Sequence, residues 1–241
     1  MPPTTNLTDI IALNAARVQE RVARAAAKVN RDAKNITIVA VSKKFGPESV
    51  TGAIAAGLTN LGENRVQEAL QKMDAVDPNK HLGVTWHLVG HLQSNKVRKV
   101  ANSFSWVHSV DSVELLQRLE NEAQLAGTQP NLLIQVALAD EATKHGASID
   151  QTRRILEAAK DCASVKVRGL MTLPPLSDNI ETTKIFFRRL HQLRDQFVRD
   201  GISPMSLEEL SMGMSQDLEV AVEEGATIIR VGTAIFGLRP R

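Results

Sequence analysis

The segment Ile36-Thr37-Ile38-Val39-Ala40-Val41-Ser42-Lys43 joins a run of apolar and β-branched residues to a lysine at its end. Such a run is typical of a buried β-strand, and the turn residues Phe45-Gly46-Pro47 would end it. Burying an unpaired ammonium inside a sheet is costly, so Lys43 is better accommodated at the mouth of a parallel sheet. A desolvated amine there can lose its proton and attack a carbonyl group. The segment therefore predicts a strand that presents a reactive lysine.

The same strand pattern recurs along the chain, and segments of helical periodicity separate each strand from the next. The predicted strands cover residues 36–41, 58–62, 85–90, 104–107, 131–137, 165–171, 207–210 and 227–231. The predicted helices cover residues 7–29, 47–56, 65–73, 94–100, 111–126, 149–162, 179–199 and 215–224, and Asn6 or Thr8 would cap the first of them.

Strict alternation of strands and helices implies parallel strands joined by helices. Eight units in a chain of 241 residues favour a closed barrel over an open doubly wound sheet. We therefore predict the α/β class, with a single (β/α)8 TIM barrel and an extra N-terminal helix. We expect one domain over residues 1–241, in which residues 1–6 form a flexible tail.

The composition of the chain excludes several classes of protein. Its 29 basic and 27 acidic residues leave a formal net charge of +2, which is too balanced to indicate a nucleic-acid-binding domain. Cys162 is the one cysteine, so an internal disulfide is impossible and a reducing compartment is expected. The first residues lack the pattern of a signal peptide, and no apolar run is long enough to span a bilayer. We therefore expect a cytoplasmic protein with neither nucleic-acid nor membrane partners.

In such barrels the functional site lies at the C-terminal ends of the strands. The residues at or just after the ends of the eight predicted strands are, in order, Lys43; Glu63 and Asn64; Gly90 and His91; His108; Lys144-His145-Gly146; Met171 and Thr172; Ser211-Met212-Gly213-Met214-Ser215; and Gly232-Thr233-Ala234. These residues are the candidates for the site. Lys144 belongs to the same face of the barrel as Lys43 and is a candidate for a second amine in it.

The last two of these segments have the composition of a phosphate-binding site. Barrels frequently bind phosphate through the loops after strands seven and eight, where backbone N–H groups at a helix start carry partial positive charge. Gly213 and Gly232 permit close approach of the backbone, and Ser211 and Thr233 add hydroxyl donors. In the alternative interpretation, Ser211 and Ser215 form only a turn and a helix cap, and Gly232 forms only a turn.

A lysine on the first strand would face phosphate loops on the last two strands across a closed barrel. Pyridoxal 5′-phosphate (PLP), which carries an aldehyde and a phosphate and is held by a lysine Schiff base, fits that arrangement. Seven motifs bear on this interpretation: Ala40-Val41-Ser42-Lys43, Gly62-Glu63-Asn64, Trp86-His87-Leu88-Val89-Gly90, Leu92-Gln93-Ser94-Asn95-Lys96, Arg168-Gly169-Leu170-Met171, Leu210-Ser211-Met212-Gly213-Met214-Ser215 and Arg230-Val231-Gly232-Thr233-Ala234-Ile235-Phe236-Gly237. These motifs occur in this order and are spread over about residues 7–238. Through them the chain resembles the pyridoxal phosphate homeostasis proteins, whose barrel is similar to the N-terminal domain of alanine racemase.

The resemblance implies a role for individual residues. Lys43 would form the Schiff base, Asn64 would lie near the cofactor ring, and Arg230 would face the pyridine nitrogen. The residues that would take the phosphate are Ser211, Gly232 and Thr233. Strand alternation alone does not choose between Lys43 and Lys44, because both faces of a barrel strand are buried, and the resemblance selects Lys43. The chain departs from the family at Lys44 and His91, where many relatives have a small polar residue and a proline.

The resemblance also implies a function: binding PLP and balancing the supply of this vitamin B6 cofactor, without substrate turnover. We expect PLP and PLP-requiring apoenzymes as partners, and a monomer. The alternative is a PLP-dependent, racemase-like enzyme acting on amino acids. Alanine racemase uses a tyrosine as its second base and a further β domain, whereas this chain has no tyrosine and stops at Arg241, shortly after the last strand. An arginine at the ring nitrogen, Arg230, would disfavour protonation of that nitrogen and weaken the electron sink. We therefore expect no catalytic residues.

Three histidines could suggest a metal site, because His87 and His91 are four residues apart and His108 follows the next predicted strand. His87 and His91 straddle a strand end and a glycine, however, and do not share a helical face. No carboxylate accompanies them at the spacing of a ligand set. The sequence therefore predicts no metal site.

Overall fold

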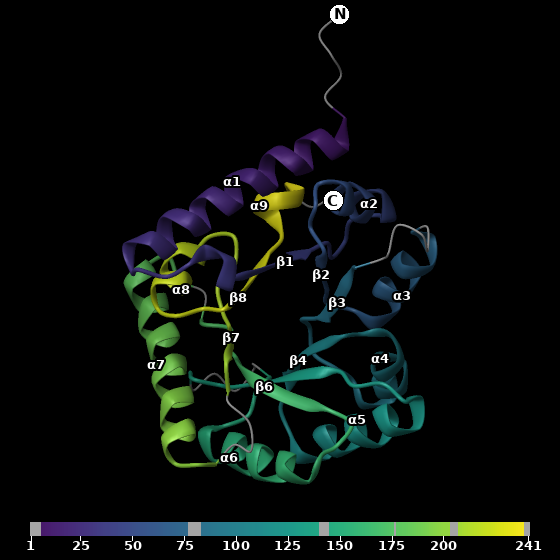
Figure 1. The fold of residues 1–241 in the computed structure, drawn as a ribbon, viewed down its shortest axis with the longest axis vertical. Coiled ribbons are helices and arrows are strands. Elements are labelled where there is room, and N and C mark those ends of the chain that lie inside the picture. Colours follow the sequence, from purple (N-terminus) through teal and green to yellow (C-terminus); the bar gives the residue numbers. More distant parts are fainter. Residues whose placement is uncertain (1–5, 77–82, 140–144, 176, 203–206, 239–241) are drawn as a thin grey trace, which may run out of the picture.

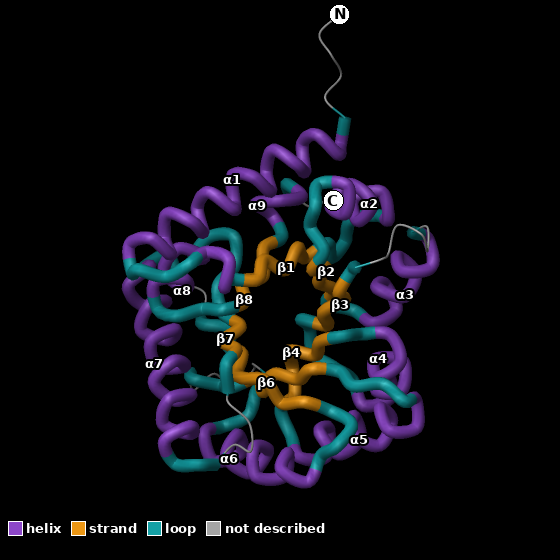
Figure 2. Tube along the Cα trace, viewed as in Figure 1, coloured by secondary structure: helices purple, strands orange, loops and turns teal. Residues whose placement is uncertain are grey.

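The computed structural model describes residues 6–76, 83–139, 145–175, 177–202 and 207–238. In this part of the chain eight parallel strands close into a barrel in chain order, and Figure 2 shows them as a ring inside a layer of helices. The strands are β1 (Thr37–Val41), β2 (Asn60–Glu63), β3 (Thr85–Leu88), β4 (Trp106–Val110), β5 (Asn131–Gln135), β6 (Lys166–Met171), β7 (Glu209–Ser211) and β8 (Ile228–Val231). The predicted (β/α)8 barrel is confirmed.

Helices connect the strands and cover the barrel from outside (Figure 1). They are α1 (Leu7–Lys28), α2 (Pro47–Ala55), α3 (Val66–Ala75), α4 (Val97–Ser103), α5 (Val113–Ala126), α6 (Ile149–Ala158), α7 (Ile180–Arg199), α8 (Leu218–Glu223) and α9 (Thr233–Phe236). Single 3-10 turns occur at Ala33–Asn35, Ser94–Lys96 and Ala159–Asp161. Among the described helices, none is both long and apolar enough to cross a membrane.

The extra N-terminal helix packs across the seam where the barrel closes. In Figure 1 α1 runs beside α8, α9 and α2, and it contacts all three. Arg21 of α1 makes a bidentate ion pair with Glu219 of α8, with nitrogen–oxygen distances of 2.6 and 2.8 Å. Asn6 caps the helix by accepting a hydrogen bond from the Asp9 amide, so it belongs to the start of the helix and not to the tail predicted over residues 1–6. Residues 1–5 lie outside the described residues.

The strands separate two hydrophobic clusters. A small cluster inside the barrel contains residues from strands and strand ends only, namely Val39, Val41, Val89, Leu133, Met171 and Ile228. The larger cluster lies between the outer face of the barrel and the helices. Because strand side chains alternate between faces, Val39 and Val41 mark which positions of β1 point into the barrel.

Two predicted strand boundaries were wrong in a way that matters for the site. β4 begins at Trp106 and not at Phe104, because α4 runs to Ser103 and Phe104 is its C-cap, buried against the core. His108 therefore lies within β4 and not after it. β7 likewise ends at Ser211 and not at Leu210, so the Ser211 side chain belongs to the strand and not to the following loop.

Candidate functional site

Lys43 follows β1 at the mouth of the barrel. Val41 points into the barrel, whereas the Ser42 hydroxyl points outward and donates a hydrogen bond to Glu63 Oε1. By the alternation of β1 Lys43 is expected on the inner face, and it is half-buried in the turn that follows the strand. Lys44 is exposed and has a φ of 68°, in the left-handed region where the chain turns away. The geometry thus distinguishes two lysines that strand alternation alone left equivalent.

A buried ionic cluster lies behind this turn, on the outer face of the barrel. Lys72 of α3 donates hydrogen bonds to Glu63 Oε1 at 2.6 Å, Glu68 Oε1 at 2.8 Å and the Ser42 carbonyl at 2.8 Å. Glu68 also accepts a hydrogen bond from the Lys44 amide. The cluster therefore fixes the backbone on both sides of Lys43.

Glu63 does not belong to the mouth, where the sequence placed it. It is the last residue of β2 and faces α3, with no exposed surface. Burial raises the pKa of the Glu63 carboxyl, against the lowering effect of hydrogen bonds from Lys72 and Ser42. Its Oε2 has no hydrogen-bond partner among the described residues. Glu63 thus supports the lysine turn from behind and is not a candidate for contact with a ligand.

Asn64, the next residue, does lie at the mouth, next to the end of β3. A Cβ atom on Gly90 would overlap the Asn64 carbonyl oxygen, so only glycine allows these two backbone segments to pack so closely. The Gly90 carbonyl in turn accepts a hydrogen bond of 2.8 Å from the Ser109 hydroxyl of β4. These contacts fix the position of Asn64, which is half-buried.

A chain of hydrogen bonds crosses the interior of the barrel. Asn60 Oδ1 lies 3.0 Å from His87 Nε2, His87 Nδ1 lies 3.0 Å from His108 Nε2, and His108 Nδ1 lies 2.9 Å from Ser211 Oγ. Arg230 Nη1 donates to the same Ser211 Oγ at 2.6 Å. Burial lowers the pKa of His87 to about 3 and that of His108 well below its usual value, so both rings are neutral at neutral pH.

Because both histidine rings are neutral, this series of hydrogen bonds can run in one direction only. The Asn60 oxygen can only accept, so His87 carries its proton on Nε2 and accepts through Nδ1. His108 must then donate through Nε2 and accept through Nδ1, which leaves the Ser211 hydroxyl as the donor to His108. The one proton of Ser211 is therefore used within the barrel, and its oxygen accepts from Arg230.

Arg230 is a buried cation with neutral partners. It is 5% exposed, and besides Ser211 it donates to the Thr172 carbonyl at 3.0 Å. Burial lowers its pKa to about 10, although nearby Asp217 acts in the opposite direction, so the guanidinium remains charged at neutral pH. Among the described residues no carboxylate lies within 4 Å of it to make an ion pair. The end of β8 therefore carries positive charge that the described protein groups do not neutralise directly.

The loops after β7 and β8 are joined to each other and lie beside the end of β1. The Arg230 amide donates to the Gly213 carbonyl at 3.0 Å, and the Ala234 amide donates to Ser215 Oγ at 3.1 Å. Gly213 has a φ of 94°, and a Cβ atom there would overlap Ala221. Gly232 is half-buried and Thr233 is exposed at the mouth.

The sequence suggested that the lysine faces the loops after β7 and β8 across the barrel. In the structure, the lysine and these loops are neighbours instead. β8 pairs directly with β1, with Val231 opposite Ala40. A Cβ atom on Gly232 would come within 3.1 Å of the Val41 carbonyl oxygen, two residues before Lys43. Closure of the barrel explains the difference, because it makes the first and last strands adjacent.

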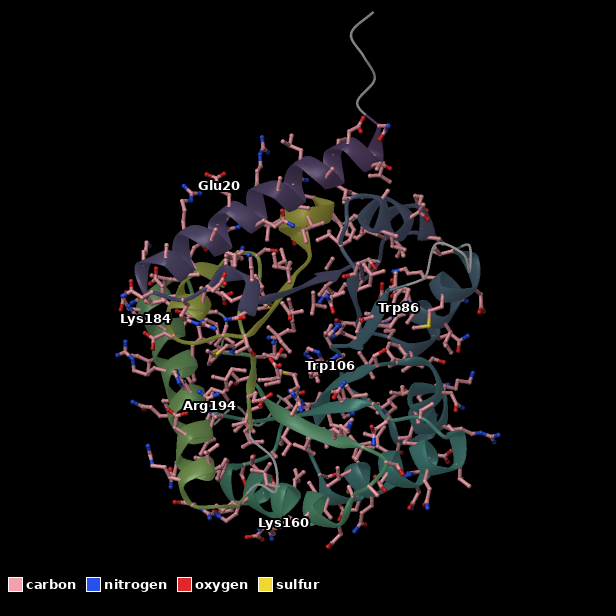
Figure 3. The ribbon with its side chains drawn as sticks, in the orientation of Figure 1. Glu20, Trp86, Trp106, Lys160, Lys184 and Arg194 are labelled. Carbon is pink, nitrogen blue, oxygen red and sulfur yellow. The ribbon has the colours of Figure 1, made fainter. Side chains whose placement is uncertain are left out.

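Some residues that the sequence singled out lie away from the site or outside the described residues, and one residue of the barrel interior was missed. His91 is separate from His87 and His108, which bond each other inside the barrel. Lys144 lies outside the described residues. Trp106 stacks on His87 with ring centroids 5.7 Å apart, and Figure 3 shows it near the middle of the barrel, whereas Trp86 packs toward the helices. The alternation of Trp106 and His108 could have identified this interior face, had the strand been placed two residues later.

Known proteins resemble this chain over nearly its whole length. The model of the alanine racemase N-terminal domain family matches residues 13–240. The pyridoxal phosphate homeostasis proteins of Pseudomonas aeruginosa and Aquifex aeolicus are 40% and 39% identical, over 95% and 92% of this chain and 96% of each relative. Among solved structures, PipY of Synechococcus elongatus, determined with PLP bound, is 38% identical with a TM-score of 0.79, covering 90% of this chain and all of that one.

Proposed function

Because the chain belongs to the alanine racemase N-terminal domain family and to its pyridoxal phosphate homeostasis proteins, we propose that it binds PLP at the mouth of the barrel. Lys43 holds the cofactor as a Schiff base, and the loops containing Gly213, Gly232 and Thr233 take its phosphate. Arg230 faces the pyridine nitrogen and Asn64 lies beside the ring.

One observation carries this proposal: a half-buried lysine lies next to two joined glycine loops, above a buried arginine that has no carboxylate within 4 Å among the described residues. In PLP the aldehyde and the phosphate-bearing carbon sit on adjacent ring atoms, so an amine and a phosphate site on adjacent strands fit it. The pyridine nitrogen lies opposite the aldehyde, and a guanidinium can donate to an unprotonated ring nitrogen. When bound, the cofactor supplies an electrophilic aldehyde and an electron-withdrawing ring.

Ser211 takes a different part in this proposal from the one the sequence implied. Its hydroxyl is fully buried, donates to His108 and accepts from Arg230. We propose that it orients the arginine beneath the cofactor, while the loop after it, with Gly213, contacts the phosphate.

The proposed role is to hold and deliver the cofactor without substrate turnover. A guanidinium at the ring nitrogen keeps that nitrogen unprotonated and so weakens the ring as an electron sink. The chain has no tyrosine to serve as a second base of the kind that alanine racemase uses. In this proposal the protein is a monomeric cytoplasmic carrier that supplies PLP-requiring apoenzymes.

The test is to trap the Schiff base. The purified protein with PLP should absorb at the violet edge of the visible, and borohydride should reduce the bond and leave a covalent adduct on Lys43. Lys43→Ala should lose both the absorbance and the adduct, because no other described amine is placed at the end of β1 on its inner face. Lys44→Ala is the matched control and should keep both. An adduct that peptide mapping finds on Lys44 alone would show that the wrong lysine has been assigned.

A further inference from the structure

A second cluster of polar side chains lies at the mouth of the barrel, away from the proposed PLP site. His91 follows β3, Asp111 follows β4 and His145 follows β5, and their ligand atoms all lie within 4.8 Å of one another. His91 Nδ1 is 3.8 Å from Asp111 Oδ2, and the rings of His91 and His145 stack with centroids 3.8 Å apart. In the ring of eight strands β4 is opposite β8, so the cluster lies across the mouth from Gly232.

Hydrogen bonds anchor the segments that carry these residues. Ser109 of β4 donates to the carbonyl of Gly90, which ties the loop of His91 to the strand that leads to Asp111. The His145 carbonyl accepts a hydrogen bond of 2.7 Å from Gln135 Nε2, at the end of β5. Two residues later Ala147 pairs with Val136 in a short bridge. Three loops distant in sequence are therefore anchored so that their side chains meet.

We propose that His91, Asp111 and His145 bind a divalent transition-metal ion. Two imidazole nitrogens and one carboxylate oxygen are a donor set that Zn²⁺, Co²⁺ and Ni²⁺ accept, whereas Mg²⁺ and Ca²⁺ prefer oxygen ligands alone. Three protein ligands leave the fourth position of a tetrahedral ion open to water. This set differs from His87, His91 and His108, for which the sequence predicted no metal site, because only His91 is common to both sets.

The rings must move slightly to bind one ion. They are nearly parallel, at an angle of 9°, so their lone pairs do not yet converge, and one ring has to rotate about its Cβ–Cγ bond. His91 and His145 are both exposed, so such a rotation meets little resistance from packing. The bound ion would link the loops after β3, β4 and β5 and so stiffen the side of the mouth opposite the PLP loops.

Titration of the tag-free protein with CoCl₂ tests the proposal, because tetrahedral Co²⁺ has a visible absorption that ZnCl₂ should quench by competition. We expect one equivalent to bind. Loss of a residue that merely supports a metal ligand costs about 10–100-fold in affinity, so His145→Ala and Asp111→Asn should weaken binding at least about tenfold. His145 is exposed and Asp111 is half-buried, and Asp111→Asn keeps the shape of the side chain, so both variants should stay folded.

His191→Ala is the matched control. His191 and Asp195 of α7 form a partly exposed histidine–aspartate pair, 3.6 Å apart, but without a third ligand among the described residues. This variant should bind Co²⁺ as the unmodified protein does. ZnCl₂ should also raise the thermal midpoint of the unmodified protein and not that of His145→Ala. Absence of the cobalt spectrum, or equal affinity in His145→Ala and the unmodified protein, would overturn the proposal.

Discussion

A single hydroxyl connects the interior of the barrel to the proposed cofactor site. Ser211 donates to His108 and accepts from Arg230, so it holds the guanidinium in one orientation. Ser211→Ala should weaken PLP retention by up to about tenfold to hundredfold, because the hydrogen bond that orients the charged Arg230 contributes about 1.5–3 kcal/mol. Equilibrium dialysis monitored by the absorbance of the bound cofactor measures this change.

Pyridoxal, which lacks the phosphate, distinguishes two explanations for the effect of Ser211→Ala. If Ser211 acts through Arg230, the variant loses affinity for pyridoxal and PLP alike, whereas a direct bond to the phosphate would affect PLP alone. Thr152→Ala is a suitable control, because it removes another buried hydroxyl, one that donates to the carbonyl of Ser148, the N-cap residue of α6. Unchanged PLP retention in a folded Ser211→Ala protein would contradict the role assigned to this residue.

At the scale of elements, β2 and α3 together support the turn that carries Lys43. Lys72 of α3 neutralises buried Glu63 at the end of β2 and also binds the Ser42 carbonyl. Lys72→Met would leave the Glu63 carboxylate buried without its cation, and breaking a buried pair in this way typically costs about 3–5 kcal/mol. Adding Glu63→Gln to the same protein removes the unpaired charge and should recover part of that loss. Urea unfolding measures both changes.

Lys28→Met provides the comparison for this prediction. Lys28 pairs with Glu223 at 2.9 Å, but 66% of its side chain is exposed. Exposed pairs contribute at most about 1 kcal/mol, so this variant should be nearly as stable as the unmodified protein. If Lys72→Met were no more destabilised than Lys28→Met, the cluster would not be the support of the lysine turn.

The architecture of the whole molecule was predictable because its pattern is repeated. Eight strand and helix segments in alternation define the barrel, and an error of two residues in one strand leaves their number and order unchanged. The site was less predictable, because it depends on which side chains point inward. The two-residue error at β4 concealed that His108 bonds Ser211. The pairing of Lys72 with Glu63 was not predictable either, because the two residues lie on a helix and a strand that only packing brings together.

The proposed absence of turnover is a property of the whole chain. Racemisation needs a base on each face of the cofactor, and the chain contains no tyrosine. With PLP bound, the protein should racemise alanine and serine no faster than free PLP. Arg230→Glu should not create a good racemase either. A carboxylate at the ring nitrogen would favour its protonation and strengthen the electron sink, but it supplies no second base.

Positioned proton transfer typically contributes about 10²–10⁴-fold, so a stronger sink without a second base should leave the rate low. Deuterium uptake at Cα measures removal of the α-proton, and loss of optical rotation measures inversion of configuration. Arg230→Gln is the control for removing the buried cation without adding a carboxylate. Deuterium uptake with retained configuration in Arg230→Glu would indicate exchange by one base, for which Lys43 is the proposed residue. Rapid racemisation in both directions by the unmodified protein would instead identify an enzyme, because it requires a second base on the other face of the ring.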